Sequence, residues 1–353
     1  MPSRDCLEWT AMSAVLNRVD APNRFLVDLL YPASTVETLD TESVELGTVI
    51  AGREMAPFVK KNGRSIMVPG EQTKFANVET PNIRISRPME ASNVMYTRRP
   101  GNRIFSSGSE NGAFEGAVAR DISNMERRIQ NTEEWMVAQT LTGFISYKTY
   151  EEDAWELTIP NQQATITTSP LWSLNDGTEN AEEDVLAVKR SMMNYEGMAP
   201  SIAIGGESAA DAFSGNTEIR AACAQVNVQV GFITREEQYN DVGVIFLGRF
   251  SGIDHVEYAR TVNLPEEMGG TQNVKLINDL QFHYCALGDQ TDRTFYYGAI
   301  NDIKALKDNT YIARRFGKSW EEEDPSVLMQ LAASRPLPFP RRPDTSIRMV
   351  VAS

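Results

Sequence analysis

The stretch from Ser109 to Thr142 constrains the fold most, because it has the pattern of one very long amphipathic helix. Its apolar residues recur three, four or seven positions apart, which is the period of one helix face. They are Phe114, Val118, Ile122, Met125, Ile129 and Met136. No proline interrupts the stretch, and Gly143 follows it, where a left-handed C-cap is favoured. About 34 residues at 1.5 Å each make a rod of about 50 Å, so the apolar face needs a long partner surface.

The polar residues of this stretch are expected on its other sides, where charges three or four positions apart can pair. They include Glu115, Arg120, Glu126, Arg127, Gln130 and Glu133. Two interpretations of the helix stay open at this point. It is either a long core helix of an ordinary enzyme or a spine on which an elongated protein is built.

Composition narrows the class of protein. A chain of 353 residues can bury a large core, and we expect two domains or one extended subunit of several parts. The net charge of −14 argues against wrapping nucleic acid, because binding phosphate needs clustered Lys and Arg. The chain can still lie beside DNA that it repels. The three cysteines show no pairing pattern and no apolar run of eighteen residues occurs, so we expect a soluble protein made in the cytosol.

The residues before the helix predict an arm and a hairpin. Residues 1–35 mix charge with scattered apolar residues and end in a compact apolar run before Pro32. Residues 36–105 alternate as strands do and contain the turn dipeptides Asn62-Gly63 and Pro69-Gly70. Their second half is basic and poor in large apolar residues. Because such a hairpin has too little core to be stable alone, we expect it to lie on a neighbouring molecule.

The residues after the helix predict a mixed α/β region followed by a returning tail. Two short strands come first, and helices and strands then alternate from about 169 to 290. The tail carries Arg314-Arg315, the acidic run Glu321–Asp324 and a closing strand over Ser346–Val351. The sequence thus predicts an α+β protein with a separate α/β part.

The sequence contains little that suggests catalysis. Its two histidines, His255 and His283, have no Cys or carboxylate at zinc-ligand spacing, and no nucleophile-elbow, zinc-helix or Walker motif occurs. Gly205-Gly206-Glu207-Ser208 superficially suggests a phosphate cradle, but it lacks the GxGxxG spacing and a following Lys. The acidic runs Glu151–Asp153 and Glu321–Asp324 are better read as solvated turns than as calcium loops. We therefore predict no catalytic residue, no metal site and no cofactor, and a protein that works by shape and contact.

Candidate residues for contacts between subunits lie in the hairpin, the helix and the tail. One is aromatic and nine are basic: Phe58, Lys60, Lys61, Arg64, Lys74, Arg84, Arg87, Arg127, Arg314 and Arg315.

The order of these parts resembles the Hong Kong 97-type fold of tailed-phage capsid proteins, and several stretches resemble the lambda-like major capsid protein E family. Those stretches are Ala56–Val59, Val68–Gly70, Asn82–Glu90, Glu126–Thr142, Tyr296–Gly298 and the tail ARRFGKSWEEEDPSVLMQLAASRPLPF. Each motif is short. Their common order over nearly the whole chain carries the resemblance.

The resemblance implies an α+β Hong Kong 97-like fold with four parts. These are an N-terminal arm over 1–35, an extension loop (a long β-hairpin) over 36–105, a peripheral domain over 106–168 and 291–353 with its spine helix over 109–142, and an α/β axial domain over 169–290.

The resemblance also implies a function, that of the major capsid protein of a tailed bacteriophage. Such subunits form pentamers and hexamers of an icosahedral shell, which encloses double-stranded DNA without sequence-specific binding. A separate scaffold, a portal and a decoration protein are the further partners implied, and no membrane is involved. The protein would be made and assembled in the host cytoplasm and reside in the virion. The alternatives are the shell of a bacterial nanocompartment, which encloses protein cargo, and an acidic cytosolic enzyme, which would have a concave polar pocket.

Overall fold

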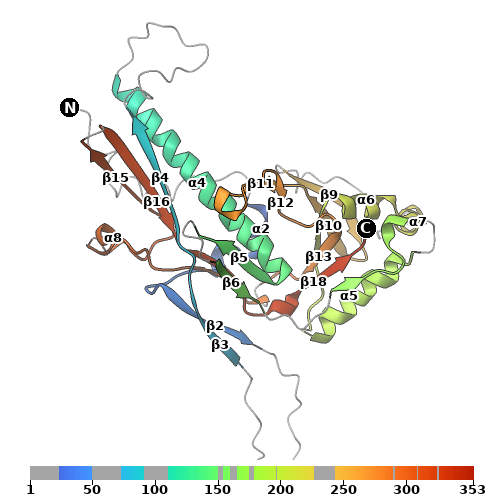
Figure 1. Ribbon diagram of the computed structural model, residues 1–353. Coiled ribbons are helices and arrows are strands. Elements are labelled where there is room, and N and C mark those ends of the chain that lie inside the picture. Colours follow the sequence, from blue (N-terminus) through green and yellow to red (C-terminus); the bar gives the residue numbers. More distant parts are fainter. Residues whose placement is uncertain are drawn as a thin grey trace, which may run out of the picture. The chain divides into compact units, whose positions relative to one another are not determined.

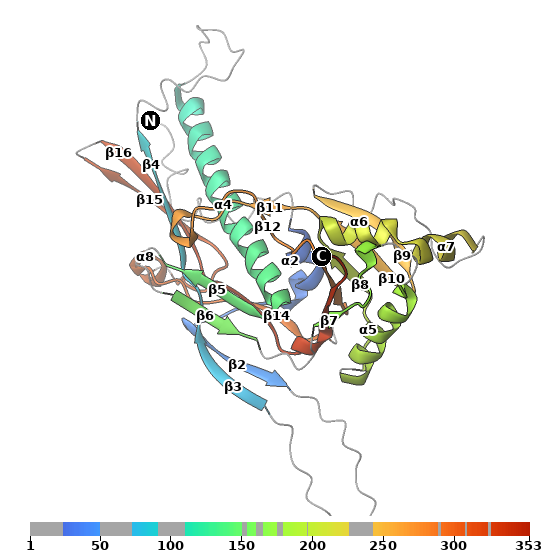
Figure 2. The same cartoon turned by 45° about the vertical axis from the view of Figure 1, so that its right-hand side comes forward.

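The computed structural model describes residues 24–49, 73–90, 110–149, 154–159, 165–174, 179–195, 197–225, 243–288, 291–307, 309–323 and 326–353. The chain divides into two compact units (Figures 1 and 2). Unit 1 comprises Met1–Val44, Asn77–Glu134 and Phe295–Pro338, and unit 2 comprises Glu45–Ala76, Trp135–Thr294 and Phe339–Ser353.

The elements that lie wholly or partly in unit 1 come from three separate parts of the chain. They are α2 (Phe25–Leu30), β1 (Val36–Thr38), β2 (Ser43–Val49), β3 (Thr73–Glu79), β4 (Ile83–Glu90), α4 (Glu110–Thr142), β14 (Arg293–Tyr297), α8 (Ile303–Lys307), β15 (Phe316–Glu322), β16 (Val327–Ser334) and β17 (Pro336–Pro340).

The long helix predicted from periodicity is present as α4, which spans Glu110–Thr142. In unit 1 its apolar stripe is buried: Val118, Ile122, Met125 and Ile129 are at most 3% exposed. This stripe packs on a three-stranded sheet of order β15-β16-β4, which runs beside the helix in Figure 1. The sheet is therefore the partner surface that the spacing of the apolar residues predicts.

The central strand β16 is buried on both faces. It pairs antiparallel with β15 and with β4, from Val327 opposite Glu90 to Ser334 opposite Ile83. Because side chains alternate across a strand, Leu328 and Ala332 face α4. Leu331 and Ala333 join a second cluster with residues of α8 and β15 on the other face. The sheet is thus the middle layer between α4 and α8.

A second sheet of unit 1 has the order β1-β14-β17. Strand β1 runs parallel to β14, with Val36 opposite Phe295. The compact apolar run before Pro32 forms α2, and its residues Leu26, Val27, Leu30 and Tyr31 are buried. Tyr31 meets the Phe295 ring edge-on, with the ring centroids 5.6 Å apart. Residues 24–31 of the predicted arm thus belong to the packed interior of this unit.

The elements of unit 2 are built around a mixed sheet. They are β5 (Phe144–Lys148), β6 (Ala154–Thr158), β7 (Ile166–Thr167), α5 (Ala181–Tyr195), β8 (Ile202–Gly205), α6 (Glu207–Gly215), α7 (Thr217–Gln225), β9 (Val244–Phe250), β10 (Ile253–Tyr258), β11 (Thr261–Val262), β12 (Val274–Lys275), β13 (Gln281–Cys285) and β18 (Ser346–Val350).

Six strands of unit 2 form one sheet of order β7-β18-β13-β8-β10-β9. Its core combines side chains of the sheet with the helices beside it, which Figure 2 shows around β8 and β10. The stripe of α5, Val185, Val188 and Met192, is fully buried there. Trp172 and Phe213 complete the core, and the Trp172 indole donates to Asp184 Oδ2 at 2.9 Å.

Two features differ from the predicted boundaries. The predicted hairpin over 36–105 includes two strands that pair within unit 1, because β1 pairs with β14 and β4 pairs with β16, while β2 and β3 form a separate two-stranded sheet. The closing strand β18 was assigned with 291–353 to the peripheral part, but it pairs with β13 in the sheet of unit 2. Both differences arise from pairing between strands that are far apart in the sequence.

Candidate inter-subunit contacts and a buried charge cluster

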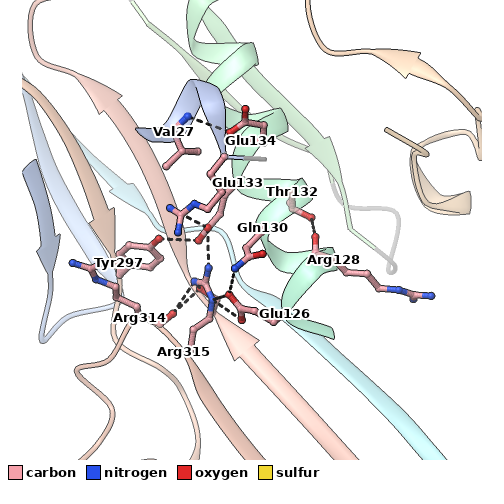
Figure 3. Close-up of polar contacts among 12 residues, drawn as sticks. Val27, Glu126, Arg128, Gln130, Thr132, Glu133, Glu134, Tyr297, Arg314 and Arg315 are labelled. Carbon is pink, nitrogen blue, oxygen red and sulfur yellow. Dashed lines mark hydrogen bonds and ion pairs between the residues drawn. The ribbon is translucent and has the colours of Figure 1, made fainter. Parts of the chain in front are cut away.

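Unit 1 contains a buried charge cluster around Arg315, which stands just before β15 (Figure 3). The guanidinium donates from Nε to both oxygens of Glu126 at 3.0 Å. It donates from Nη2 to Glu133 Oε2 at 2.8 Å. Its Nη1 donates to Ser334 Oγ at 2.9 Å and to the Arg314 carbonyl at 3.1 Å. Every nitrogen of the guanidinium therefore has an acceptor in the same unit.

Glu133 and Glu134 of α4 connect this cluster to the beginning of the described chain. Tyr297 donates its hydroxyl to Glu133 Oε1 at 2.9 Å, and Arg24 lies 3.8 Å from Glu133 Oε2. Glu134 accepts the amides of Leu26 and Val27 at 2.8 and 3.1 Å. These are among the first amides of α2, which have no acceptor within the helix and no side-chain cap from Arg24. A carboxylate of α4 thus caps α2.

Burial governs the electrostatics of the cluster. Burial raises the pKa of Glu126, and the attraction of Arg315 only partly offsets this effect. For Arg315 the effect of burial is to lower its pKa, but Glu133, Tyr297 and Glu126 outweigh it, so its pKa is raised. Burial, followed by the neighbouring Glu133, also raises the pKa of Tyr297. Arg315 stays charged, and the two carboxylates share its charge.

This arrangement has a structural role. It joins α2, α4, β14 and the segment before β15 in one network, and each link joins elements distant in sequence. Removing one partner of such a pair leaves a buried charge without compensation, which costs about 3–5 kcal/mol. The cluster therefore favours one arrangement of these elements over others.

Two sequence expectations change as a result. Glu126, Gln130 and Glu133 were expected away from the apolar stripe, but each is at most 5% exposed. The predicted pairing at a spacing of four does occur, since Gln130 donates to Glu126 Oε1 at 2.8 Å. Arg315 was a candidate for contacts between subunits, but it is 4% exposed and its partners belong to its own unit.

The other candidate contact residues fall into two groups. Phe58, Lys60, Lys61 and Arg64, together with the side chain of Lys74, lie outside the described residues. The described candidates, Arg84, Arg87, Arg127 and Arg314, are at the surface of unit 1. Arg84 pairs with Asp302 at 3.2 Å and Arg87 with Asp121 at 3.3 Å, while about half of each arginine side chain remains exposed.

The two histidines of unit 2 are structural. His255 is fully buried, donates from Nδ1 to the Ile253 carbonyl at 3.1 Å and accepts the Tyr284 hydroxyl at Nε2, 3.3 Å away. Burial lowers its pKa to about 3. Burial likewise lowers the pKa of His283 to about 4. Neutral imidazoles inside a packed sheet have no access to a substrate.

The glycine turn that resembles a phosphate cradle is filled by the protein itself. Gly206 is the N-cap of α6, and a Cβ on it would lie 2.6 Å from the carbonyl oxygen of Asn278. The Ala209 amide at this helix end already donates to the Asp279 carbonyl at 2.7 Å. Ser208 lies inside α6, which begins at Glu207 and has no side-chain cap.

Two kinds of functional feature are absent from the described residues. They contain no group of three or more His, Cys, Asp or Glu placed to hold a metal ion. No helix in the described ranges is long and apolar enough to cross a membrane.

Comparison with known proteins identifies the family. Residues 8–351 match the family described as phage major capsid protein E, so the chain belongs to that family. No curated protein sequence matches the chain.

The solved structures that resemble the chain agree with this family. A protein of E. coli CFT073, assigned as a prophage capsid protein, aligns with a TM-score of 0.72 and 15% identity over 98% of this chain and 99% of its own. A phage-related protein of Bordetella bronchiseptica RB50 aligns with a TM-score of 0.53 and 11% identity over 97% of both chains.

The fold is therefore the Hong Kong 97-like capsid fold, and the protein is a phage major capsid protein. Membership of this family means that the chain self-assembles into a shell and resides in the virion. Its role is structural.

Proposed function

We propose that the chain forms pentamers and hexamers of an icosahedral shell that encloses double-stranded DNA. The match to the capsid family over residues 8–351 carries this proposal. Assembly takes place in the host cytoplasm on a separate scaffold, with a portal at one vertex and a decoration protein on the mature shell. The net charge of −14 keeps free subunits soluble and lets the enclosed DNA move over the shell without binding it.

The basic residues between β2 and β3 supply contacts to neighbouring subunits. Lys60, Lys61 and Arg64 belong to residues 50–72, which carry four basic and two acidic side chains in a chain that is acidic as a whole. A basic segment is attracted to the acidic surface of another copy, and contacts that close around five- and six-fold axes require two different surfaces on each subunit. The exposed Arg84, Arg87, Arg127 and Arg314 extend this set on unit 1.

Deletion of residues 50–72 tests this proposal. Val49 would be joined to Thr73 by a two-residue turn, which keeps β2, β3 and the pairing of β4 with β16. We expect a folded subunit with the circular dichroism and melting behaviour of the full chain, but no shells. Both proteins would be produced together with the genes that flank this one and examined by electron microscopy and sedimentation.

A matched variant separates charge from chain length. Lys60→Glu, Lys61→Glu and Arg64→Glu together retain the full segment, and we expect the same loss of shells. Normal shells from both variants would contradict the role of this segment. A full-length chain that never assembles would contradict the proposed function itself.

The contents of the purified shells separate a capsid from a nanocompartment. Double-stranded DNA inside particles that have a portal is the expected result. Shells that contain only protein cargo and lack a portal would favour the alternative. We also infer that the protein catalyses no reaction, and the two most enzyme-like groups, His255 and His283, are buried and neutral.

A further inference from the structure

The short helix α8 exposes an apolar and basic face on unit 1. Ile303 is 72% exposed and Leu306 is 56% exposed. The two residues are three positions apart and therefore lie on one side of the helix. Lys304 and Lys307 are exposed beside them, and Ile312 follows nearby with 43% of its surface exposed. An isolated exposed leucine is ordinary, but Ile303 and Leu306 are large aliphatic side chains three positions apart on the same helix, where side chains are neighbours.

The structure holds this face in a fixed position. Ala305, on the opposite side of α8, is fully buried against Phe316, Leu331 and Ala333. Asp302 accepts the Lys304 amide at 2.9 Å and also binds the side chains of Arg84 and Lys318. The apolar residues are therefore presented by an anchored helix.

The charges of α8 have a complement elsewhere on the same unit. Glu321, Glu322 and Glu323 are all exposed at the end of β15. Among the described residues, none of these glutamates and neither lysine of α8 forms an ion pair. The seven residues of β15 extend about 23 Å, so its acidic end lies far from the end that packs on Ala305. Figures 1 and 2 show α8 near one end of the sheet and the other end of β15 well away from it.

We infer that α8 is one half of a contact between subunits, and that its occupant is a second copy of this chain. Ile303 and Leu306 pack on the neighbouring copy, and Lys304 and Lys307 pair with its Glu321 and Glu322. The two halves differ, as contacts that close into rings require. This inference rests on the proposed function, because it specifies one surface through which the shell assembles.

Charge reversal tests the contact in both directions. Lys304→Glu with Lys307→Glu, and separately Glu321→Lys with Glu322→Lys, would place like charges opposite each other. We expect each pair to reduce the yield of shells at least about tenfold, and the four changes combined in one chain to restore it to within about threefold. Glu37→Lys with Asp40→Lys is the control for the glutamate pair, since it makes the same change of charge at exposed positions of unit 1 and should leave assembly unchanged.

Replacing the two apolar residues of α8 by aspartate tests what covers this helix. Ile303→Asp with Leu306→Asp should abolish shells and leave the melting temperature of the unassembled subunit unchanged. A melting temperature that falls by more than about 5 °C would mean that another segment of the same chain covers the face, which would overturn the inference. If the aspartate variant and both charge variants formed shells in the yield of the unchanged chain, the inference would also be overturned, while the proposed function would stand. Failure of the combined variant to recover would reject the pairing of α8 with the end of β15. If the unchanged chain itself formed no shells, the proposed function would fail first.

Discussion

The guanidinium of Arg315 and the carboxylate of Glu133 form a hydrogen-bonded ion pair of 2.8 Å, although 182 residues separate them in the sequence. Arg315 is 4% exposed and Glu133 has no exposed surface. The pair joins α4 to the segment that enters β15, and Tyr297 and Arg24 share the same carboxylate. It is therefore a contact that holds three distant parts of unit 1 together.

Replacing Arg315 should destabilise unit 1 strongly. Arg315→Met keeps an unbranched side chain but leaves Glu126 buried without its cation and Glu133 with only the more distant Arg24, 3.8 Å away. Removing a partner of such a buried pair costs about 3–5 kcal/mol. Hydrogen exchange of α4 amides over residues 118–134 would report this as faster exchange. The neighbouring Arg314 is exposed, and its side chain contacts the cluster through a cation–π contact with Tyr297, 5.9 Å from the ring centroid. Arg314→Met is therefore the control and should change the free energy of opening by less than about 1 kcal/mol. Equal protection in the two variants would show that the pair contributes little.

Glu126 should give unit 1 a characteristic dependence on pH. Burial raises its folded pKa above the unfolded value, so between these two values the folded chain binds more protons. Stability therefore falls as pH rises through this window, in contrast to a carboxylate with a lowered pKa. Glu126→Gln cannot titrate. We expect the stability of the native chain relative to this variant to decrease as pH rises above about 4.5, and to level off once the pH exceeds the folded pKa. A difference that does not change with pH in urea titrations would contradict the raised pKa.

The sequence predicts the long helix because apolar residues recur at helical spacing along its whole length. The same arithmetic also places Glu126 and Glu133 on the buried face, four and eleven positions after Ile122. Their charge, by contrast, predicts exposed positions on the polar sides, and for these two residues that prediction is wrong. The signal for burial was their position. Their partner Arg315 could not be identified, because nothing local in a single sequence records a contact across 182 residues.

Strand pairing was the other limit. The segment Phe316–Glu322 has no alternation of apolar and polar residues, yet it forms β15 because β16 provides a partner along its length. Similarly, β4 looked like part of a projecting hairpin, but it completes the sheet under α4. Strand propensity depends on the neighbours that a strand acquires, whereas helix periodicity is local.

A pair of substitutions in α4 tests whether its stripe is buried. Ile122 is 2% exposed, so Ile122→Asp would bury an unpaired carboxylate at a cost of several kcal/mol, against a typical domain stability of about 5–15. We expect insoluble or unfolded protein. Arg127 lies on the exposed side, and Arg127→Asp should leave the subunit folded. Circular dichroism and solubility compare the pair, and equal folding of both would refute the burial of the stripe.

Two glycines at the ends of α6, the N-cap Gly206 and the last residue Gly215, offer a matched test of close packing in unit 2. A Cβ on Gly206 would lie 2.6 Å from the Asn278 carbonyl oxygen, and backbone atoms cannot move aside as a flexible side chain can. Gly206→Ala should therefore destabilise unit 2 by about 1–3 kcal/mol. Gly215 ends the same helix with no atom within 4 Å of its Cβ position, so Gly215→Ala should be neutral or slightly stabilising. Thermal unfolding would show the difference. If Gly206→Ala left the stability of unit 2 unchanged, the backbone at Asn278 would be able to shift at little cost.

His255 should make unit 2 sensitive to acid. Its ring stacks on Phe213 with centroids 4.4 Å apart, and the neutral form satisfies both nitrogens, because Nδ1 donates to Ile253 and Nε2 accepts from Tyr284. Burial lowers the folded pKa from 6.5 to about 3. Between these two pH values the unfolded chain binds a proton at His255 and the folded chain does not. Stability is then fully present above pH 6.5 and is lost as pH falls, by up to about 1.4 kcal/mol per pH unit.

His255→Phe removes the titrating group and keeps an aromatic ring in the cluster. The variant should be less stable than the native chain at pH 7, because the Ile253 carbonyl and the Tyr284 hydroxyl lose their partner, at a cost of about 1–3 kcal/mol. Its stability should nevertheless fall less steeply between pH 6 and 4.5. His283 continues to titrate in both proteins, so the comparison isolates His255. Urea unfolding followed by fluorescence at several pH values measures the two slopes, and identical slopes would mean that His255 already takes up its proton in the folded state.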